Sequence, residues 1–578
     1  MINFNSGYKD NLKYWIAYLI GFIAILAIIV TGGFYMVRPH LDSFVKKEMK
    51  RHSIKAETSG VSILGKVNLT NVTVPVSSGV SLKIGAISAR PPISFIPGTF
   101  TLYNVDLKYN NTHVQIPKIS LGGVSLKKKD PTITFKPLQS VMRVELSSVV
   151  APNILLSMAN GNKQTEKIEI KNFQLYNFKN GRINSVSLQK MDLEKDVNGL
   201  TPMHLIAKSK AIEARDIDIL YAYSVIFGKN KVTNKGKVVM GAISLDDTMV
   251  NIFAGTEKNA SFSTGKFKIS NLAIKSPEKT YGELFQAYHN AKKGNNQAAP
   301  KALLRALAIN NWLFHITSVD AQINKASIDI PQLKVTFESF RFKPGQWEQW
   351  IPQKLLFSIK NLLVQPKRMK EKDLNIFSAM YSEPLAFSEN LDFSYNEKER
   401  TLFLNGLSNV EDLFSEEMSV KIINVDPRLF SALHLQGEMG SALRNIGVTE
   451  MMIRYTDSGF IDKIFSHAAQ YLNDNKRDLK EELYQNLDLI MTQSPKILLK
   501  NHDKAEMISK SLGDFAKKLR TKGAHTLTIK MMAQDKEGIT MADFDNAMRS
   551  DPLSIIRKLS LTINNETSTF TLKSDDLI

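Results

Sequence analysis

An eight-residue phrase recurs along the chain: apolar, any, apolar, any, Asn, apolar, any, apolar. Complete copies are centred on Asn71, Asn104, Asn172, Asn271 and Asn361. Alternating apolar and polar residues are typical of a strand with one buried face. In each copy the alternation slips by one residue at the Asn, so a regular strand would there turn its apolar side chains to the opposite face. Because Asn tolerates the left-handed conformation that bulges and bends use, we predict that these five residues are bend positions in the strands of a long, twisted antiparallel sheet.

Turn residues and helical patterns divide the chain further. The pair Asn180-Gly181 separates two strand-like segments and predicts a hairpin. Apolar residues at helical spacing predict a helix pair within residues 281–313 and three helices after residue 457. Alternation returns at residues 527–531 and 559–563.

A long apolar run lies near the start of the chain, between Lys13 and Arg38. As a helix of about 24 residues it is long enough to cross a hydrocarbon core of roughly 30 Å. A cleaved signal peptide would have a shorter apolar stretch and a small-residue cleavage site, whereas this run ends in Gly-Gly-Phe-Tyr. We therefore expect an uncleaved membrane anchor, whose ends are marked by Tyr14, Trp15, Tyr35 and Arg38.

Together these patterns predict an α+β fold: a single N-terminal transmembrane helix, then a long bent antiparallel β-rich body with a helical insertion and a C-terminal α+β module. The expected segments are a short tail at 1–13, the transmembrane helix at 14–37, a β-rich domain at 38–280, the helical insertion at 281–313, a second β-rich segment at 314–456 and the C-terminal α+β module at 457–578.

The orientation of the anchor is not decided by its flanking charges. Two lysines precede the run and five basic residues follow it by residue 51, so the positive-inside rule places the large domain in the cytoplasm. That rule weakens for long downstream domains. The absence of cysteine from the chain excludes structural disulfides and fits either compartment.

The net charge of +19 raises the question of an anionic partner. The lysines are scattered among polar residues, with local runs only at 127–129, 367–372 and 517–522. None of these runs lies in an RNA-binding aromatic motif or a recognition helix. The pattern favours solvated faces, leaves contact with lipid headgroups open and argues against nucleic acid as a partner.

Catalytic motifs are missing from the sequence. Residues 60–67 imitate a phosphate-binding loop, but Val67 stands where Ser or Thr would hold Mg²⁺. The ten histidines are spread singly and form no zinc motif. We therefore expect no catalytic residue, no metal site and no cofactor, although carboxylates distant in the chain can still meet in space. The polar cluster at 454–459 predicts a capping turn before a helix. Trp347 and Trp350 predict a packed loop corner or a contact with membrane or partner.

The segments 98–107 and 168–175, which follow the apolar run and a short basic connector, resemble the AsmA-like proteins of Gram-negative envelopes over residues 1–275. This resemblance implies a single-pass inner-membrane protein with its bulk in the periplasm and a β-rich groove involved in lipid transport or envelope homeostasis. The segment 454–463 is similar to C-terminal modules of uncharacterised membrane-anchored alphaproteobacterial proteins. The helical C-terminal module departs from the AsmA-like pattern.

Three functions remain open from the sequence. The first is a non-enzymatic envelope protein whose bent sheet offers an apolar face to a lipid ligand, with the bilayer contacted through the N-terminal helix. The second is an assembly or scaffold protein that docks an envelope protein partner through its C-terminal helices. The third is an envelope hydrolase, which would need carboxylates clustered in a cleft.

Overall fold

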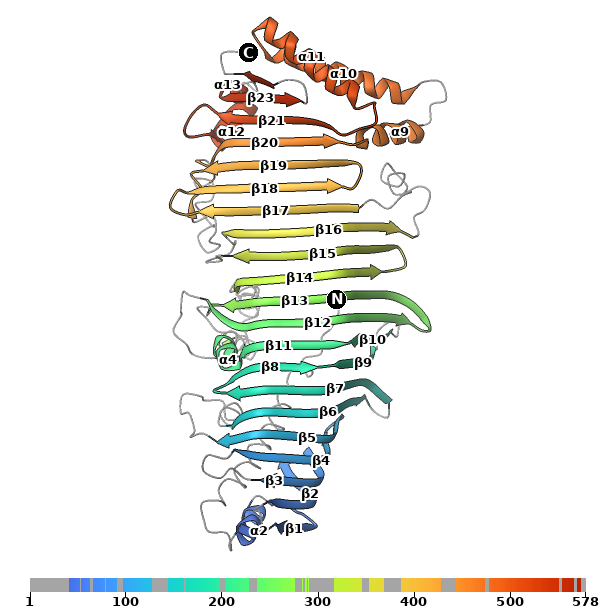
Figure 1. Ribbon diagram of the computed structural model, residues 1–578, viewed down its shortest axis with the longest axis vertical. Helices are drawn as coiled ribbons and strands as arrows, with labels where there is room; N and C mark the ends of the chain where they lie inside the picture. The colour runs from blue at the N-terminus through green and yellow to red at the C-terminus, as the bar shows by residue number, and fades with distance from the viewer. Residues whose placement is uncertain are drawn as a thin grey trace. The chain divides into compact units, whose positions relative to one another are not determined.

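The protein is built mainly from β-strands, as the computed structural model shows (Figure 1). Of the described residues, 66% lie in strands and 20% in helices. The α+β class predicted from the sequence is therefore wrong. The three helices expected after residue 457 are present, but the strand that follows them, His525–Ala533, pairs with strand β20 (Gly447–Asp457), which belongs to the preceding β-rich segment.

The structure describes residues 41–572 with gaps. The residues outside the description are 1–40, 52, 63–65, 78–79, 91–96, 127–143, 161–162, 198–202, 228–235, 276–315 apart from 283, 286, 287 and 290, 346–352, 368–385, 428–442, 444, 473–477, 550–553, 566–568 and 573–578. The predicted transmembrane helix at 14–37, with Tyr14, Trp15, Tyr35 and Arg38, lies outside the described residues, as do Trp347 and Trp350 and nearly all of the predicted insertion at 281–313. None of the helices that are described has both the length and the apolar character needed to cross a membrane.

The chain divides into two compact units. Unit 1 comprises Met1–Thr233 and Lys237–Asn310, and unit 2 comprises Asn234–Gly236 and Asn311–Ile578. The main elements of unit 1 are α2 (Leu41–Arg51), β1 (Thr58–Val61), β2 (Val67–Ser77), β3 (Val80–Arg90), β4 (Gly98–Tyr109), β5 (Thr112–Leu126), β6 (Val144–Asn160), β7 (Lys163–Lys179), β8 (Arg182–Leu188), β9 (Lys190–Val197), β10 (Met203–Ser209), β11 (Ala211–Asp218), α4 (Ile219–Phe227), β12 (Lys237–Ala254) and β13 (Glu257–Ile274).

Unit 1 is an antiparallel sheet in which strands that follow one another in sequence lie side by side. β1 to β7 pair in order. β8 and β9 together form one long strand beside β7, and β10 and β11 form the next. β12 pairs with both β10 and β11, and β13 pairs with β12. The predicted hairpin joins β7 to β8, where Asn180 and Gly181 have φ of 52° and 71°, as a type I′ turn requires.

Unit 2 is also an antiparallel sheet, and it carries most of the helices that the structure describes. Its strands are β14 (Ile316–Asp329), β15 (Leu333–Gly345), β16 (Lys354–Pro366), β17 (Ala386–Asn396), β18 (Thr401–Val410), β19 (Phe414–Ile423), β20, β21 (His525–Ala533), β22 (Ile539–Thr540), β23 (Leu559–Asn565) and β24 (Thr569–Leu572). β14 to β20 pair in order. The chain then forms α9 (Phe460–Leu472), α10 (Leu479–Leu498) and α11 (His502–Lys518) before β21 returns beside β20. α12 (Met541–Arg549) and α13 (Ser554–Arg557) precede β23.

The five phrase asparagines occupy the left-handed region of backbone space. Asn71, Asn104, Asn172, Asn271 and Asn361 have φ of 46°, 53°, 52°, 53° and 51°, and each lies inside a strand. Pairing with the neighbouring strands continues on both sides of each Asn. The strands therefore absorb one extra residue at these points without ending.

These bends are aligned across neighbouring strands. Asn71, Gly85 and Asn104 stand at one level of β2, β3 and β4, between residue pairs that are in register on either side. A Cβ atom at Gly85 would lie 3.1 Å from the Cβ of Asn104, so this position favours glycine. A second row runs through Asn177, Asn184, Asp216, Gly241 and Asn271 of β7, β8, β11, β12 and β13. Because adjacent strands slip at the same level, one side of the sheet remains apolar across each row.

Candidate functional site

One side of the unit 1 sheet is apolar from β2 to β13, and we call it the apolar face. Two rows of paired residues define it, on either side of the bends. The first row is Val74, Leu82, Leu107, Val114, Leu156, Ile168, Leu193, Ala207, Val250 and Phe262. The second row is Val67, Ala89, Phe100, Leu121, Val149, Leu175, Val186, Ala214, Ile243 and Ile269.

Burial of this face changes along the sheet. On β2 to β6 its side chains are buried apart from a few such as Leu156, with Leu82 and Leu102 each 1% exposed, and they form a core with Val45 and Met49 of α2. On β7 to β13 most members of the same two rows are only half-buried. The apolar face thus continues from a closed core into a part where its side chains retain accessible area.

Two polar groups interrupt the apolar face. Glu166 of β7 and Lys195 of β9 form an ion pair with 3.1 Å between Nζ and Oε2, and the Glu166 side chain is only 9% exposed. Further along, Thr248 Oγ1 donates to Ser209 Oγ over 3.2 Å. The neighbouring Thr264 hydroxyl is buried and has no hydrogen-bond partner among the described residues. These are the polar positions of the face at which a ligand could form a hydrogen bond.

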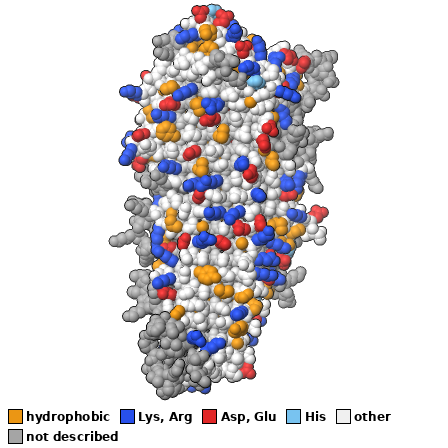
Figure 2. All heavy atoms as spheres, in the orientation of Figure 1, with side chains coloured by type: hydrophobic (Ala, Val, Ile, Leu, Met, Phe, Trp, Pro, Cys, Tyr) orange, Lys and Arg blue, Asp and Glu red, His pale blue; other side chains and the backbone are white. Residues whose placement is uncertain are grey.

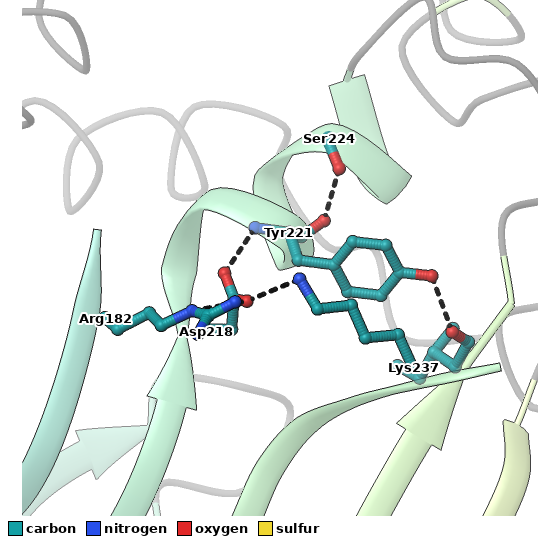
Figure 3. Close-up of polar contacts among 6 residues, drawn as sticks. Arg182, Asp218, Tyr221, Ser224 and Lys237 are labelled. Atoms are coloured by element: carbon teal, nitrogen blue, oxygen red, sulfur yellow. Dashed lines mark hydrogen bonds and ion pairs between the residues drawn. The ribbon is translucent and has the colours of Figure 1, made fainter. Parts of the chain in front are cut away.

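Helix α4 stands at the end of β11, and Asp218 fixes its start (Figure 3). Asp218 Oδ1 accepts from the backbone N–H of Tyr221 at 2.8 Å, while Oδ2 pairs with Lys237 Nζ at 2.8 Å and Arg182 Nε at 3.1 Å. Lys237 Nζ also lies 4.7 Å from the centre of the Tyr221 ring. The Tyr221 hydroxyl donates to the carbonyl of Ile274.

The electrostatics of this cluster favour a charged carboxylate. Burial alone raises the pKa of Asp218, but the hydrogen bonds from Lys237 and Tyr221, with the charges of Lys237 and Arg182, outweigh it, so the pKa lies below its ordinary value. The donors and charges of the cluster satisfy one another. We therefore assign it a structural role, in which it holds the uncharged helix α4 at the ends of β8, β11 and β12.

Unit 2 has an apolar row of its own. It consists of Pro344, Leu355, Phe393, Leu404, Val420, Met451, Met531, Leu561 and Leu572. At β21 to β24, α10 and α11 cover this side, where Ile508, Leu512 and Phe515 of α11 belong to one core with Leu527 and Ile563. On β17 and β18 a polar pair interrupts it, because Ser408 Oγ donates to Glu389.

Charged side chains lie mainly on the strand positions that alternate with these apolar rows. They include the bidentate contact of Arg341 with Asp320, at 2.8 and 3.1 Å, and the pair of Arg454 with Glu417 at 3.1 Å. Figure 2 shows side chains of both charge signs dispersed over the visible face, with no single block of lysines. This dispersion is typical of a solvated surface.

The predicted bend residues adopt a left-handed backbone conformation, and some of them also form side-chain hydrogen bonds to a neighbouring strand or turn. Asn172 Nδ2 donates to Gln189 Oε1 at 2.6 Å, and Asn361 Nδ2 donates to Glu338 Oε2 at 2.8 Å. Sequence reasoning missed further bends at Asp216, Asp247 and Lys325, which have φ of 53°, 44° and 52°.

The polar cluster at 454–459 forms the predicted capping turn. Asp457 is 1% exposed and accepts from the backbone N–H groups of Gly459 at 2.9 Å and Ile461 at 3.1 Å, at the start of α9. The Tyr455 hydroxyl donates to the same carboxylate at 2.8 Å. Burial, followed by this hydrogen bond, raises the pKa of Tyr455 above its ordinary value.

Within the described part of the chain, no three side chains of the metal-binding types converge on one point. His113 lies 2.9 Å from Asp106, and His204 lies 2.8 Å from Asp196, each as a separate pair. Among the described residues of unit 1, the half-buried part of the apolar face together with its polar interruptions is therefore an extended surface that a ligand could cover.

Comparison with known proteins covers only the end of unit 2. A family model described as an uncharacterized protein matches residues 408–566, from the end of β18 to β23 and including α9, α10 and α11. No curated protein matches the chain. The match identifies a recurring C-terminal segment and carries no information on its activity.

Proposed function

We propose that the chain is a non-enzymatic envelope protein that binds lipid acyl chains on the apolar face of unit 1. The observation that supports this most is the continuity of the two apolar rows from the closed core at β2–β6 into the half-buried strands β7–β13. Covering the accessible part of these side chains with an acyl chain would remove apolar area from water, worth roughly 25 cal/mol per Å².

The length of the half-buried part suits such a ligand. From β7 through β9, β10 and β12 to β13 there are four steps between adjacent strands. At about 4.8 Å a step, a row spans roughly 19 Å. One leaflet of a hydrocarbon core is about 15 Å thick, half of the whole core. An extended acyl chain laid along a row can therefore contact all five strands.

Attachment to a membrane is part of the same proposal and rests on the sequence. The apolar run at 14–37 ends only a few residues before α2 begins at Leu41, and α2 packs Val45 and Met49 into the unit 1 core. A bilayer-spanning segment there would hold unit 1 beside the headgroups. We propose an inner-membrane protein whose bulk lies in the periplasm, in line with the resemblance to AsmA-like proteins.

Lipid that co-purifies with the full chain tests this function. Val250 lies on the apolar face, and its neighbour Met249 points to the opposite face and is 40% exposed. Val250→Glu places a charge where the acyl chain would lie, which is costly, whereas Met249→Glu places the same charge in solvent. After solvent extraction and mass spectrometry, we expect lipid in the wild type and in Met249→Glu, and little in Val250→Glu. Absence of lipid from the wild type, or its retention in a folded Val250→Glu variant, would contradict the proposal.

A second candidate function is assembly with a partner protein through the C-terminal helices. It is favoured by the exposed apolar side chains of α10, Leu489, Ile490 and Ile497, which are 56%, 61% and 66% exposed. A photo-crosslinking residue at Ile490 would be expected to capture one defined protein in cells. A diffuse set of products, the same as that from the exposed Lys398 in the turn between β17 and β18, would remove this candidate.

A further inference from the structure

The polar side of unit 1 contains a hollow between β7, β8 and β11. Its volume is about 420 Å³, which is within the range of small-molecule sites. We call it the polar hollow. Its polar and aromatic lining residues are Tyr176, Asn184, Ser185, Ser187, Glu213, Arg215 and Asp216, and Val186 and Ala214 complete the lining. Tyr176, Ser185 and Arg215 are paired across the three strands, one position away from the apolar row through Leu175, Val186 and Ala214.

A row of bends passes along this hollow. Asn184 and Asp216 stand opposite each other at the second bend row, and Asp216 has a φ of 53°. On the next strand, β12, a Cβ atom at Gly241 would lie 2.9 Å from Asp216 Oδ2. The backbone of β12 therefore approaches Asp216 closely. The sheet itself therefore fixes these lining residues, with no loop among them.

Some of the lining groups are held in place by the protein. Arg215 Nη2 donates to Glu213 Oε2 at 3.3 Å, and the Tyr176 hydroxyl donates to Gln174 Oε1 at 3.0 Å. The Tyr176 side chain remains 40% exposed, which leaves part of its aromatic surface accessible. The hollow thus combines an aromatic surface with an ordered pair of charges.

The remaining polar side chains are available to a ligand. Asn184, Ser185, Ser187 and Asp216 make no side-chain hydrogen bond or ion pair with any residue that the structure describes. They offer an amide, two hydroxyls and a carboxylate, which together both donate and accept hydrogen bonds. Two carboxylates face one guanidinium, so the lining has a net negative charge that disfavours an anion.

We propose that the polar hollow binds a neutral carbohydrate, with one sugar ring against Tyr176. Each sugar hydroxyl can both donate and accept a hydrogen bond. It can therefore pair with the carboxylate, which only accepts, and with the amide and hydroxyl groups, which do both. The C–H groups on one side of a sugar ring form a flat apolar surface that matches the exposed aromatic ring. An acyl chain would leave the polar groups of the hollow unpaired. This proposal is independent of the lipid proposal, because Tyr176, Ser185 and Arg215 alternate with the apolar row through Leu175, Val186 and Ala214.

Titration of the purified full chain with two disaccharides, N,N′-diacetylchitobiose and maltose, tests this site by calorimetry or saturation-transfer NMR. We expect saturable binding of at least one of them below about 10 mM. Tyr176→Ala should weaken binding about tenfold, and Asp216→Asn should weaken it by a similar factor through loss of a charged acceptor. Asn retains the left-handed conformation at this position, so the second variant keeps the bend.

Tyr103 supplies a matched control. It is 39% exposed and precedes the bend residue Asn104, as Tyr176 precedes Asn177, but it lies outside the hollow. Tyr103→Ala should bind as the wild type does, and Tyr176→Phe should retain most of the binding if the ring is the contact. Failure of both disaccharides to bind, or an equal loss in the Tyr103 and Tyr176 variants, would overturn the proposal.

Discussion

At the scale of the residue, the slip in alternation carries more information than the identity of the amino acid at the slip. Asn71 and the other phrase asparagines could be identified as bends from sequence because Asn tolerates positive φ. Residues 212–219 repeat the same phrase with Asp216 at the central position, and residues 321–328 repeat it with Lys325. Both adopt the same conformation. A search that ignored the central residue type would have found them.

The bend at Asn104 gives a prediction on stability. Asn104→Val places a β-branched residue at a φ of 53°, next to Gly85, and should lower the free energy of unfolding by about 1–3 kcal/mol. Asn104→Gly should change it much less, because Gly adopts this conformation without strain. Urea unfolding of the two variants compares them directly. Equal destabilisation by Val and Gly would show that the side chain of Asn104, rather than its backbone conformation, is what matters.

At the scale of the element, the sequence indicated where many strands and helices lie, but it predicted an α+β fold for a chain that is mostly β-sheet. The apolar periodicity after residue 457 predicted α9, α10 and α11, which are all present. It gave no sign that β21 pairs with β20 across an intervening helical segment of more than 60 residues. Helical periodicity is a local signal, whereas strand pairing depends on register between distant segments. The module expected at 457–578 is therefore continuous with the sheet of unit 2.

The attachment of α4 gives a prediction on pH. The pKa of Asp218 is lower in the folded protein than its unfolded value near 3.8. The carboxylate therefore contributes stability that is present above the unfolded pKa and lost as the pH falls through the folded pKa. Asp218→Asn should lower the free energy of unfolding by about 2 kcal/mol at neutral pH, and this difference should shrink as the pH falls below about 4.

Asp216→Asn is the matched control for that measurement, since Asp216 is on the same strand and has no ion-pair partner among the described residues. Its stability should follow that of the wild type from about pH 7 to about pH 3. Urea unfolding at several pH values distinguishes the two variants. If Asp218→Asn lowered the free energy of unfolding by the same amount at every pH, the shape of the Asp218 side chain, and not its charge, would hold α4 in place.

At the scale of the whole molecule, the sequence predicted a long bent antiparallel sheet with one apolar face but not the alignment of its bends. The rows through Asn71 and Asn271 depend on register between strands that the phrase alone cannot supply. The alignment keeps the unit 1 sheet apolar on one side, and that side passes from a closed core to half-buried strands. The polar hollow was beyond sequence reasoning for the same reason, because its lining comes from three strands.

Crosslinking at two adjacent residues tests the central claim, that the apolar face of unit 1 holds acyl chains. Val250 and Met249 point to opposite faces of β12. A photo-crosslinking side chain is placed at one or the other position in the full chain, which is expressed in living cells. After illumination in cells with labelled lipid, we predict a lipid adduct at Val250 and little or none at Met249. Equal labelling at both positions, or no adduct at Val250, would contradict the account.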